Sequence, residues 1–186
     1  WPAWRRDAMT NLPRATLILG GARSGKSQFA EKLFEPFDEK VYLATAVAGD
    51  NEMKARINAH RARRATGWLT IEEPLNIVDV IAAEGDKGRP LLIDCLTLWA
   101  MNFVSTGRDG GQEVTLLFEA LNKTSGPVVM VSNEIGLGVI PENDLSRLFV
   151  DMQGNVNQVA AQASDRVIFV TAGLPLVMKD QRSESA

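Results

Sequence analysis

Residues 16–27 read Thr-Leu-Ile-Leu-Gly-Gly-Ala-Arg-Ser-Gly-Lys-Ser, and this stretch decides the fold. Its last eight residues match the pattern G-x-x-x-x-G-K-[ST] of a phosphate-binding loop. The four residues before Gly20 form a short apolar run of strand formers, as expected for a buried strand. A helical pattern follows from Lys26 to about Phe34 and is stopped by Pro36. The motif therefore lies between a strand and a helix, which is the context that such a loop requires.

The chemistry expected of this loop follows from its residue types. Gly20 and Gly25 allow a tight turn and a close approach of the backbone to a phosphate group. Successive N–H groups then point inward, and the start of the helix adds its positive end. We expect Lys26 to reach the β- and γ-phosphates and the Ser27 hydroxyl to ligate Mg²⁺. The alternative is a glycine-rich turn without a ligand. The nucleotide-binding residues predicted here are Gly20, Gly21, Ala22, Arg23, Ser24, Gly25, Lys26 and Ser27.

The rest of the chain alternates continuous apolar runs with helical patterns. Strands are predicted at 41–45, 68–71, 90–94, 127–132 and 167–170, with 174–178 as a hairpin partner. Helices are predicted at about 50–64, 74–83, 96–104, 114–122 and 142–164, with a polar, glycine-rich loop at 105–112. This alternation is typical of a mainly parallel sheet with helices on both faces. The sequence thus predicts one nucleotide-binding α/β domain over 13–180, with terminal extensions at 1–12 and 181–186.

Composition narrows the classes of function. The chain has 20 Lys plus Arg against 23 Asp plus Glu, a net charge of −3, which argues against general nucleic-acid binding. No apolar run reaches the roughly 18 residues of a membrane-spanning helix. Cys95 is the single cysteine, so an internal disulfide is excluded, and a reducing cytoplasmic location is expected. The chain begins with Trp1, and Met9 is an alternative natural first residue.

Asp94 is the acidic partner that the phosphate loop needs. It ends the apolar run Leu91-Leu92-Ile93, the place where a Walker B acid lies near the metal ion. The alternative is an Asp that caps the following helix. A guanine-reading N-K-x-D motif is absent from the sequence, because Ser125 stands where the acid of Asn122-Lys123-Thr124-Ser125 should be. A switch GTPase is therefore not predicted.

His60 is the only histidine, which excludes any site built from two histidines. On a helix over 50–64, Met53, Ile57, His60 and Arg64 fall along one line, so the stripe begins apolar and ends cationic. Such a histidine could attack the α-phosphorus of a nucleotide and form a phosphoramidate. The alternative is a surface histidine attracted to the C-terminal end of a helix.

Four further stretches accompany the phosphate loop in a fixed order. They are Tyr42–Ala46 (Y-[IL]-A-T), Glu52–Arg64 (E-M-x-x-R-I-x-x-H-[RK]-x-x-R), Asp94–Asn102 (D-C-L-T-x-W-x-x-N) and Val131–Pro141 (V-[ST]-N-E-V-G-x-G-[IL]-V-P). Together these motifs resemble the bifunctional adenosylcobinamide kinase and adenosylcobinamide-phosphate guanylyltransferase family of cobalamin synthesis. The resemblance extends from about Thr16 to Lys179, which is nearly the whole chain.

The resemblance implies a P-loop fold of the RecA-like kind and two reactions. A nucleoside triphosphate, ATP or GTP, phosphorylates the hydroxyl of the aminopropanol arm of adenosylcobinamide. GMP is then transferred from GTP, through a guanylylated histidine, to give adenosylcobinamide-GDP and pyrophosphate. The family's nucleophile falls on His60, and its members assemble as trimers or related homo-oligomers. The implied partners are therefore the two cobinamide substrates, GTP or ATP, and further copies of the chain.

The resemblance also carries a set of nucleotide contacts onto this sequence. Beyond the phosphate loop they are Ala44, Thr45, Ala46, Arg61, Ala62, Arg63, Arg64, Glu72 and Asp94. Ala46 lacks the hydroxyl that family members often carry there, so a contact at this position is expected from the backbone alone. The neighbouring Glu73 is an alternative to Glu72. Catalytic roles are expected for His60 and Lys26, and Mg²⁺ ligation for Ser27 and Asp94.

Other residues keep two interpretations. Asn133 and Glu134 follow a strand and so lie at the carboxyl edge of the sheet, where they could contact Mg²⁺ or the corrinoid arm. The alternative there is a turn stabilised by Asn and Pro. Trp68 and Trp99 could stack on a base or a corrin, or lie in the core. Two other functions compete with the bifunctional enzyme: a small-molecule kinase in which His60 is incidental, and a nucleotide-gated binding protein.

Overall fold

A seven-stranded sheet forms the centre of the computed structural model, which describes residues 12–47 and 66–181. The strands are β1 Ala15–Gly20, β2 Lys40–Ala44, β3 Trp68–Glu72, β4 Leu91–Asp94, β5 Val128–Asn133, β6 Arg166–Thr171 and β7 Leu174–Asp180. Their order in the sheet is β3-β2-β4-β5-β1-β6-β7. Strands β1 to β6 run parallel, and β7 is the antiparallel hairpin partner of β6. The predicted mainly parallel sheet is confirmed.

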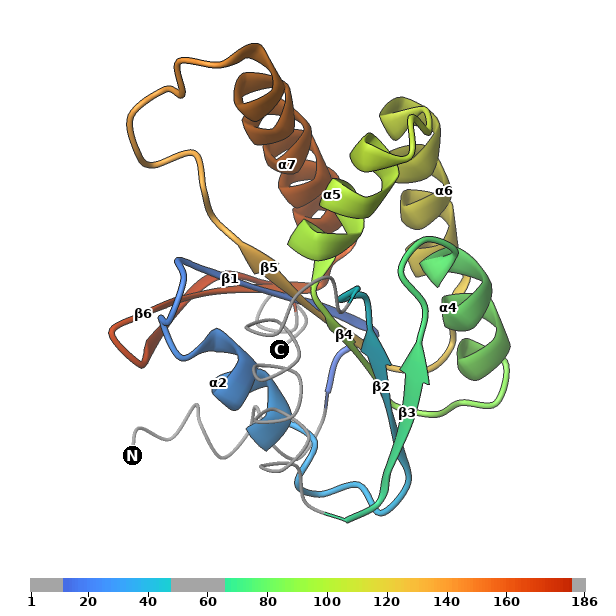
Figure 1. Cartoon of the computed structure of the whole chain (residues 1–186). Helices are drawn as coiled ribbons and strands as arrows, with labels where there is room; N and C mark the ends of the chain where they lie inside the picture. The colour runs from blue at the N-terminus through green and yellow to red at the C-terminus, as the bar shows by residue number, and fades with distance from the viewer. Residues whose placement is uncertain (1–11, 48–65, 182–186) are drawn as a thin grey trace.

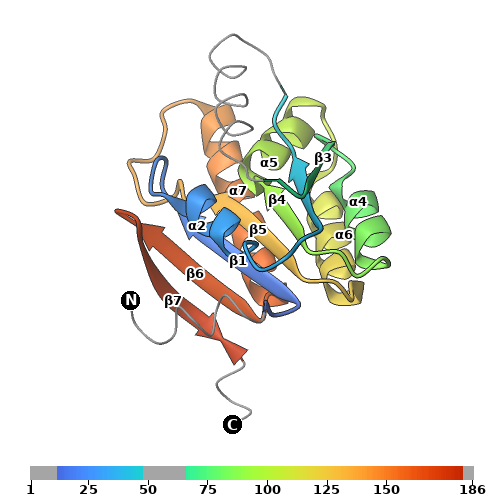
Figure 2. The same ribbon diagram turned by 90° about the horizontal axis from the view of Figure 1, so that it is seen from below.

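Helices cover both faces of this sheet, as predicted. They are α2 Lys26–Lys32, α4 Ile77–Gly85, α5 Leu96–Ser105, α6 Gly110–Lys123 and α7 Asp144–Ala163. Helices α4 to α7 lie on one face and α2 lies on the other (Figures 1 and 2). Within the described residues, no helix is both long enough and apolar enough to cross a membrane.

The core is divided by the sheet into two layers, because successive side chains of a strand point to opposite faces. In β5, Val128 and Met130 belong to the layer under α4 to α7, whereas Val129 and Val131 belong to the layer under α2. Buried parallel strands need apolar side chains on both faces, which is why these segments read as continuous apolar runs.

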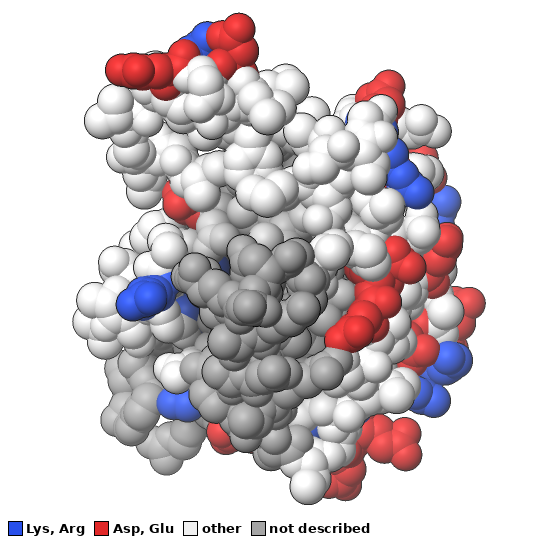
Figure 3. All heavy atoms as spheres, in the orientation of Figure 1, with Lys and Arg blue, Asp and Glu red and all other residues white. Residues whose placement is uncertain are grey.

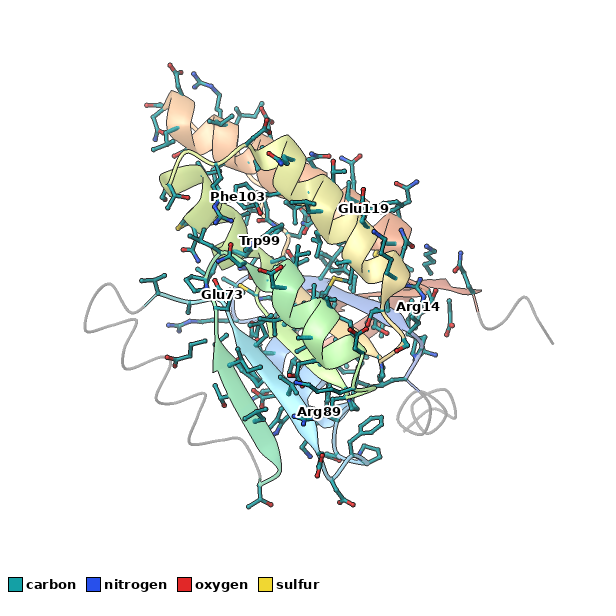
Figure 4. All side chains as sticks on the ribbon, turned by 90° about the vertical axis from the view of Figure 1, so that its right-hand side faces the viewer. Arg14, Glu73, Arg89, Trp99, Phe103 and Glu119 are labelled. Atoms are coloured by element: carbon teal, nitrogen blue, oxygen red, sulfur yellow. The ribbon has the colours of Figure 1, made fainter. Side chains whose placement is uncertain are left out.

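The two tryptophans that the sequence left open lie against core residues. Trp99 is fully buried, donates from Nε1 to the carbonyl oxygen of Leu75 at 2.9 Å, and packs edge-on against Phe103 with ring centroids 4.9 Å apart (Figure 4). Trp68 is half-buried and its ring centroid lies 5.1 Å from that of Phe34. The core interpretation therefore holds for Trp99.

The start of α6 corrects the sequence prediction. The helix begins at Gly110, inside the predicted loop at 105–112 and four residues before the predicted start at Val114. Asp109 is the reason, because its Oδ1 accepts hydrogen bonds from the N–H groups of Gly111 at 2.9 Å and Gln112 at 3.2 Å. This N-cap allows two glycines with low helix propensity to form the first turn. The helix predicted at 50–64 lies outside the described residues.

We expect Asp109→Ala to lower the free energy of unfolding by about 1 kcal/mol, because two N–H groups of the first turn lose their acceptor. Urea denaturation followed by circular dichroism measures the change. Asp109→Asn is the matched control, since its side-chain oxygen can still accept these hydrogen bonds, and it should cost only a few tenths of a kcal/mol. An equal loss in both variants would contradict the capping role.

Candidate functional site

The phosphate loop joins β1 to α2 in a conformation that depends on its glycines. Gly25 has φ 93°, in the left-handed region, which glycine adopts without strain. A Cβ atom at Gly20 would lie 2.3 Å from the carbonyl oxygen of Val170, so a larger residue has no room there. The loop is also tied to the β6–β7 turn, because Gly173 donates its N–H to the carbonyl oxygen of Ser24 at 2.9 Å. The predicted strand-loop-helix context is confirmed.

Lys26 begins α2 and its side chain returns over the loop. The ammonium group donates to the carbonyl oxygen of Gly21 at 3.1 Å. Burial lowers the pKa of Lys26, while the negative charge of the nearby Asp94 acts in the opposite direction. An additional negative charge would therefore stabilise the charged ammonium group, and a triphosphate would supply that charge.

Asp94 ends β4 and does not cap the next helix. Cys95, and not Asp94, is the N-cap residue of α5. The Asp94 carboxylate instead accepts a hydrogen bond at Oδ2 from the Tyr42 hydroxyl at 2.9 Å. The capping alternative is therefore wrong, and the carboxylate is held beside β2 at the carboxyl edge of the sheet.

The strand register places several predicted residues together at this edge. Ala44 pairs with both Glu72 and Asp94, and Gly20 pairs with Asn133. Side chains two or four positions earlier on the same strands pack in the layer under α2: Tyr42, Trp68, Leu92 and Val131. Because strand side chains alternate, the residues at the strand ends face the same side as α2. These are Ala44, Glu72, Asp94 and Asn133.

Glu73 faces the other way. Its Oε1 accepts from the N–H groups of Leu75 and Asn76, both at 2.8 Å, in the turn before α4 (Figure 4). This turn also explains why α4 begins at Ile77 rather than at the predicted Pro74. Of the two acidic residues that the sequence could not separate, Glu72 is the one on the face of the phosphate loop.

Thr45 has a structural role that sequence reasoning missed. Its buried hydroxyl accepts from the Cys95 N–H and donates to the Cys95 carbonyl oxygen, both at 2.8 Å. Asn102 donates from Nδ2 to the Thr45 carbonyl oxygen at 2.8 Å and to that of Pro74 at 3.0 Å. Thr45 therefore fastens the end of β2 to α5. Asn102 stands in the D-C-L-T-x-W-x-x-N motif, which was the available signal for this contact.

Cys95 lies next to Asp94 but is unsuited to nucleophilic chemistry. The thiol is buried, and burial, followed by the charge of Asp94, raises its pKa to about 12. At neutral pH the thiol is therefore protonated, whereas the thiolate is the reactive form. Cys95 acts as a small packing residue at the start of α5.

Five of the predicted site residues cannot be placed. His60, Arg61, Ala62, Arg63 and Arg64 lie outside the described residues. Within the described residues, no group of three or more His, Cys, Asp or Glu side chains is gathered as a metal site. The predicted Ser27 and Asp94 pair is a smaller set and needs no such group.

A phosphate loop between β1 and α2, with an acidic residue at the end of a nearby parallel strand, defines a P-loop nucleotide-binding protein. Solved structures agree on the fold. A protein of Pyrococcus horikoshii superposes with a TM-score of 0.57 at 8% identity, covering 100% of this chain and 96% of that one. An ATPase from a bacterial type III secretion system gives 0.55 at 12% identity, covering 86% of this chain and 51% of that one.

The family is shown by sequence. The model described as cobinamide kinase / cobinamide phosphate guanyltransferase matches residues 16–178. The bifunctional adenosylcobalamin biosynthesis protein CobP of Pseudomonas aeruginosa is 48% identical over 170 residues, which are 89% of this chain and 97% of that protein. CobU of Salmonella typhimurium, which carries the same description, is 34% identical over 178 residues, 88% and 98% of the two chains. The chain belongs to the cobinamide kinase / cobinamide phosphate guanylyltransferase family.

Proposed function

We propose that this chain phosphorylates adenosylcobinamide with ATP or GTP and then transfers GMP from GTP to the resulting phosphate. The observation that carries the proposal is the family match over residues 16–178. The structure supports it, because strand alternation places the Asp94 side chain on the same face of the sheet as α2, the helix that follows the phosphate loop. The proposal places both reactions in one nucleotide-binding domain at 13–180. A cytoplasmic location remains a prediction.

In the first reaction, the acceptor hydroxyl attacks the γ-phosphorus and releases its proton, and the bond to the nucleoside diphosphate breaks so that the diphosphate leaves. The loop N–H groups and the Lys26 ammonium group stabilise the negative charge of the phosphate oxygens. Ser27 and Asp94 present hydroxyl and carboxylate oxygens, which are the donors that Mg²⁺ prefers. When bound, this ion would neutralise charge on the phosphates. The Tyr42 hydroxyl orients the Asp94 carboxylate for that role.

In the second reaction, a ring nitrogen of His60 attacks the α-phosphorus of GTP, and pyrophosphate leaves. The phosphate of adenosylcobinamide phosphate then attacks the same phosphorus, which frees the histidine and forms adenosylcobinamide-GDP. His60 is supported by being the only histidine in the sequence. We assign charge balance of the triphosphate to Arg61, Arg63 and Arg64.

The nucleotide contacts proposed near the sheet are Ala44, Thr45, Ala46 and Glu72. At Thr45 the hydroxyl is already bonded to Cys95, so a contact there is proposed through the backbone. Glu72 is preferred to Glu73 because it lies on the α2 face beside Ala44. A carboxylate at that place can accept hydrogen bonds from ribose hydroxyls or from guanine N–H groups.

Labelled GTP tests the function directly. With GTP labelled at the α-phosphate, we expect the protein to gain an acid-labile, base-stable label that His60→Ala lacks. With GTP labelled at the γ-phosphate, the label should pass to cobinamide. Lys26→Ala should impair both transfers, because both are proposed to use the phosphate loop.

The two competing functions give different results in the same experiment. A kinase without guanylyltransferase activity would transfer only the γ-label, and would leave the protein unlabelled by α-labelled GTP. A nucleotide-gated binding protein would transfer no label at all. Retained guanylylation in Lys26→Ala would show that the two reactions use separate triphosphate sites.

Glu72→Gln and Glu73→Gln form a matched pair for the nucleotide contact. We expect Glu72→Gln to raise the KM for GTP about tenfold, since it replaces a charged acceptor with a neutral one, worth about 1.4 kcal/mol. Glu73→Gln should stay within about twofold, because its amide oxygen can still accept from Leu75 and Asn76. Steady-state kinetics measures both. A larger rise in the KM for GTP in Glu73→Gln than in Glu72→Gln would assign the nucleotide contact to Glu73 instead.

We also propose that the chain forms a homo-oligomer, a trimer by resemblance. In the loop between β5 and α7, the apolar residues Leu137, Val139 and Ile140 are 81%, 96% and 78% exposed. In Figure 3 the surface formed by this loop is mostly uncharged and ends in a charged tip. Large exposed apolar surfaces commonly mark interfaces.

Light scattering coupled to size exclusion tests the assembly. We expect the unmodified chain to exceed the monomer mass of 20.3 kDa, and the double substitution V139E/I140E to shift it toward that mass. Leu116→Glu, at an exposed position of α6, is the control and should leave the mass unchanged. A monomeric unmodified chain would contradict the proposal.

A further inference from the structure

Asn133 lies where one strand extends beyond its neighbour. Strand β4 ends at Asp94, which pairs with Val131, so β4 offers no backbone partner to Asn133. On its other side, β5 continues along β1, with Gly20 paired to Asn133 and the Glu134 N–H donating to the Gly20 carbonyl oxygen at 3.1 Å. The backbone N–H and C=O groups of Asn133 face away from β1 and therefore need hydrogen-bond partners other than a strand.

Three side chains replace the missing strand in a closed circuit. The Asn133 N–H donates to Thr97 Oγ1 at 2.8 Å, and Thr97 Oγ1 lies 3.4 Å from Ser132 Oγ. Ser132 Oγ donates to Asn157 Oδ1 at 2.7 Å, and Asn157 Nδ2 donates to the Asn133 carbonyl oxygen at 3.1 Å. The circuit begins and ends on the backbone of one residue, using side chains from α5, β5 and α7. Figure 1 shows these three elements next to one another.

Gln153, one turn before Asn157 on α7, forms hydrogen bonds with two members of this circuit. Its Nε2 donates to Ser132 Oγ at 2.8 Å and to Asn157 Oδ1 at 3.0 Å. The side chain is fully buried, and its Oε1 has no hydrogen-bond partner within the described part of the chain. A buried polar residue with one unsatisfied atom costs stability. An apolar residue would fill this place more favourably if packing were its only role.

The circuit lies on the opposite face of the sheet from the phosphate loop. Ser132 points toward α5 and α7, so the next residue, Asn133, presents its side chain to the α2 face. Because β5 separates β1 from β4, that side chain lies between the phosphate loop and Asp94. Among the described residues, no hydrogen-bond partner of the Asn133 side-chain amide is observed.

We propose that Thr97, Gln153 and Asn157 are positioning residues for phosphoryl transfer, which act by fixing the Asn133 backbone so that its amide Nδ2–H donates to an oxygen of the transferred γ-phosphoryl group. This inference rests on the kinase reaction proposed above. Asn133 is then a catalytic residue, since it touches the reacting group. A preorganised donor of this kind costs little reorganisation when charge develops, which is why holding the backbone rigid has value.

Thr97 gives the sharpest test, because valine has the same shape without the hydroxyl. We expect Asn133→Ala to lower kcat for γ-phosphoryl transfer about 100-fold and Thr97→Val about tenfold, with the nucleotide KM within about twofold in each. Thr97→Ser keeps the hydroxyl and should recover most of kcat. Thr115→Val, on the exposed face of α6, removes a similar hydroxyl elsewhere and is the control for general effects.

A double-mutant cycle separates positioning from a merely structural role. If Thr97 acts through Asn133, then Thr97→Val should have no further effect on kcat in the Asn133→Ala background. Each variant is first shown to be folded by its urea transition, and kcat is expressed per folded molecule. Gln153→Leu provides a second entry point should Thr97→Val fail to fold, and should show the same dependence on Asn133.

The outcomes are distinct from failure of the proposed function. An unmodified chain without kinase activity would refute the function itself. An active unmodified chain with full kcat in Asn133→Ala would overturn the proposed phosphate contact. An equal loss on adding Thr97→Val to both backgrounds would overturn the positioning role, because the circuit would then act independently of Asn133.

Discussion

The parallel pairing of β1 with β5 is the constraint on which the other features of the site depend. It places Gly20, the first residue of the phosphate loop, beside Asn133, and brings the Glu134 N–H to the Gly20 carbonyl oxygen. With β6 on its other side, β1 is buried along its whole length. The loop therefore starts from a rigid base, and the close contact of Gly20 with Val170 leaves room only for glycine.

The carboxyl edge of the sheet shows how side chains replace strands where strands stop. The Thr45 hydroxyl forms hydrogen bonds with both the N–H and the carbonyl oxygen of Cys95. Thr97 and Asn157 together do the same for the N–H and the carbonyl oxygen of Asn133. Each case satisfies backbone groups that would otherwise be buried without partners, which is costly in a low-dielectric interior. The edge thereby stays ordered although its strands end at different heights.

Much of this arrangement could be predicted from sequence because its signals are local. Apolar runs gave the strands, and the spacing of Gly20, Gly25 and Lys26 gave the loop. The start of α6 could not be read, because helix propensity at Gly110 and Gly111 opposes a cap supplied by Asp109. Propensity is a weak prior that a specific hydrogen bond can override.

Choices that depend on strand register were also beyond the sequence. Glu72 and Glu73 are adjacent and chemically equivalent, and a one-residue difference moves a side chain to the other face. The pairing of Ala44 with Glu72 decides between them. The circuit around Asn133 joins residues up to 60 positions apart (Thr97 to Asn157), whose contacts become visible only when α5 and α7 pack against the sheet and against each other.

Electrostatics links this frame to the chemistry of the site. Lys26 is buried enough for desolvation to lower its pKa, and Asp94 offsets only part of that effect. A triphosphate bound in the loop would bring further negative charge to a partly desolvated ammonium group, where the interaction is stronger than in water. The same low dielectric makes a misplaced donor expensive. A site that gains its charge stabilisation from burial therefore benefits from a backbone that is fixed in advance, and the polar residues behind Asn133 hold its backbone from the face of the sheet opposite the phosphate loop.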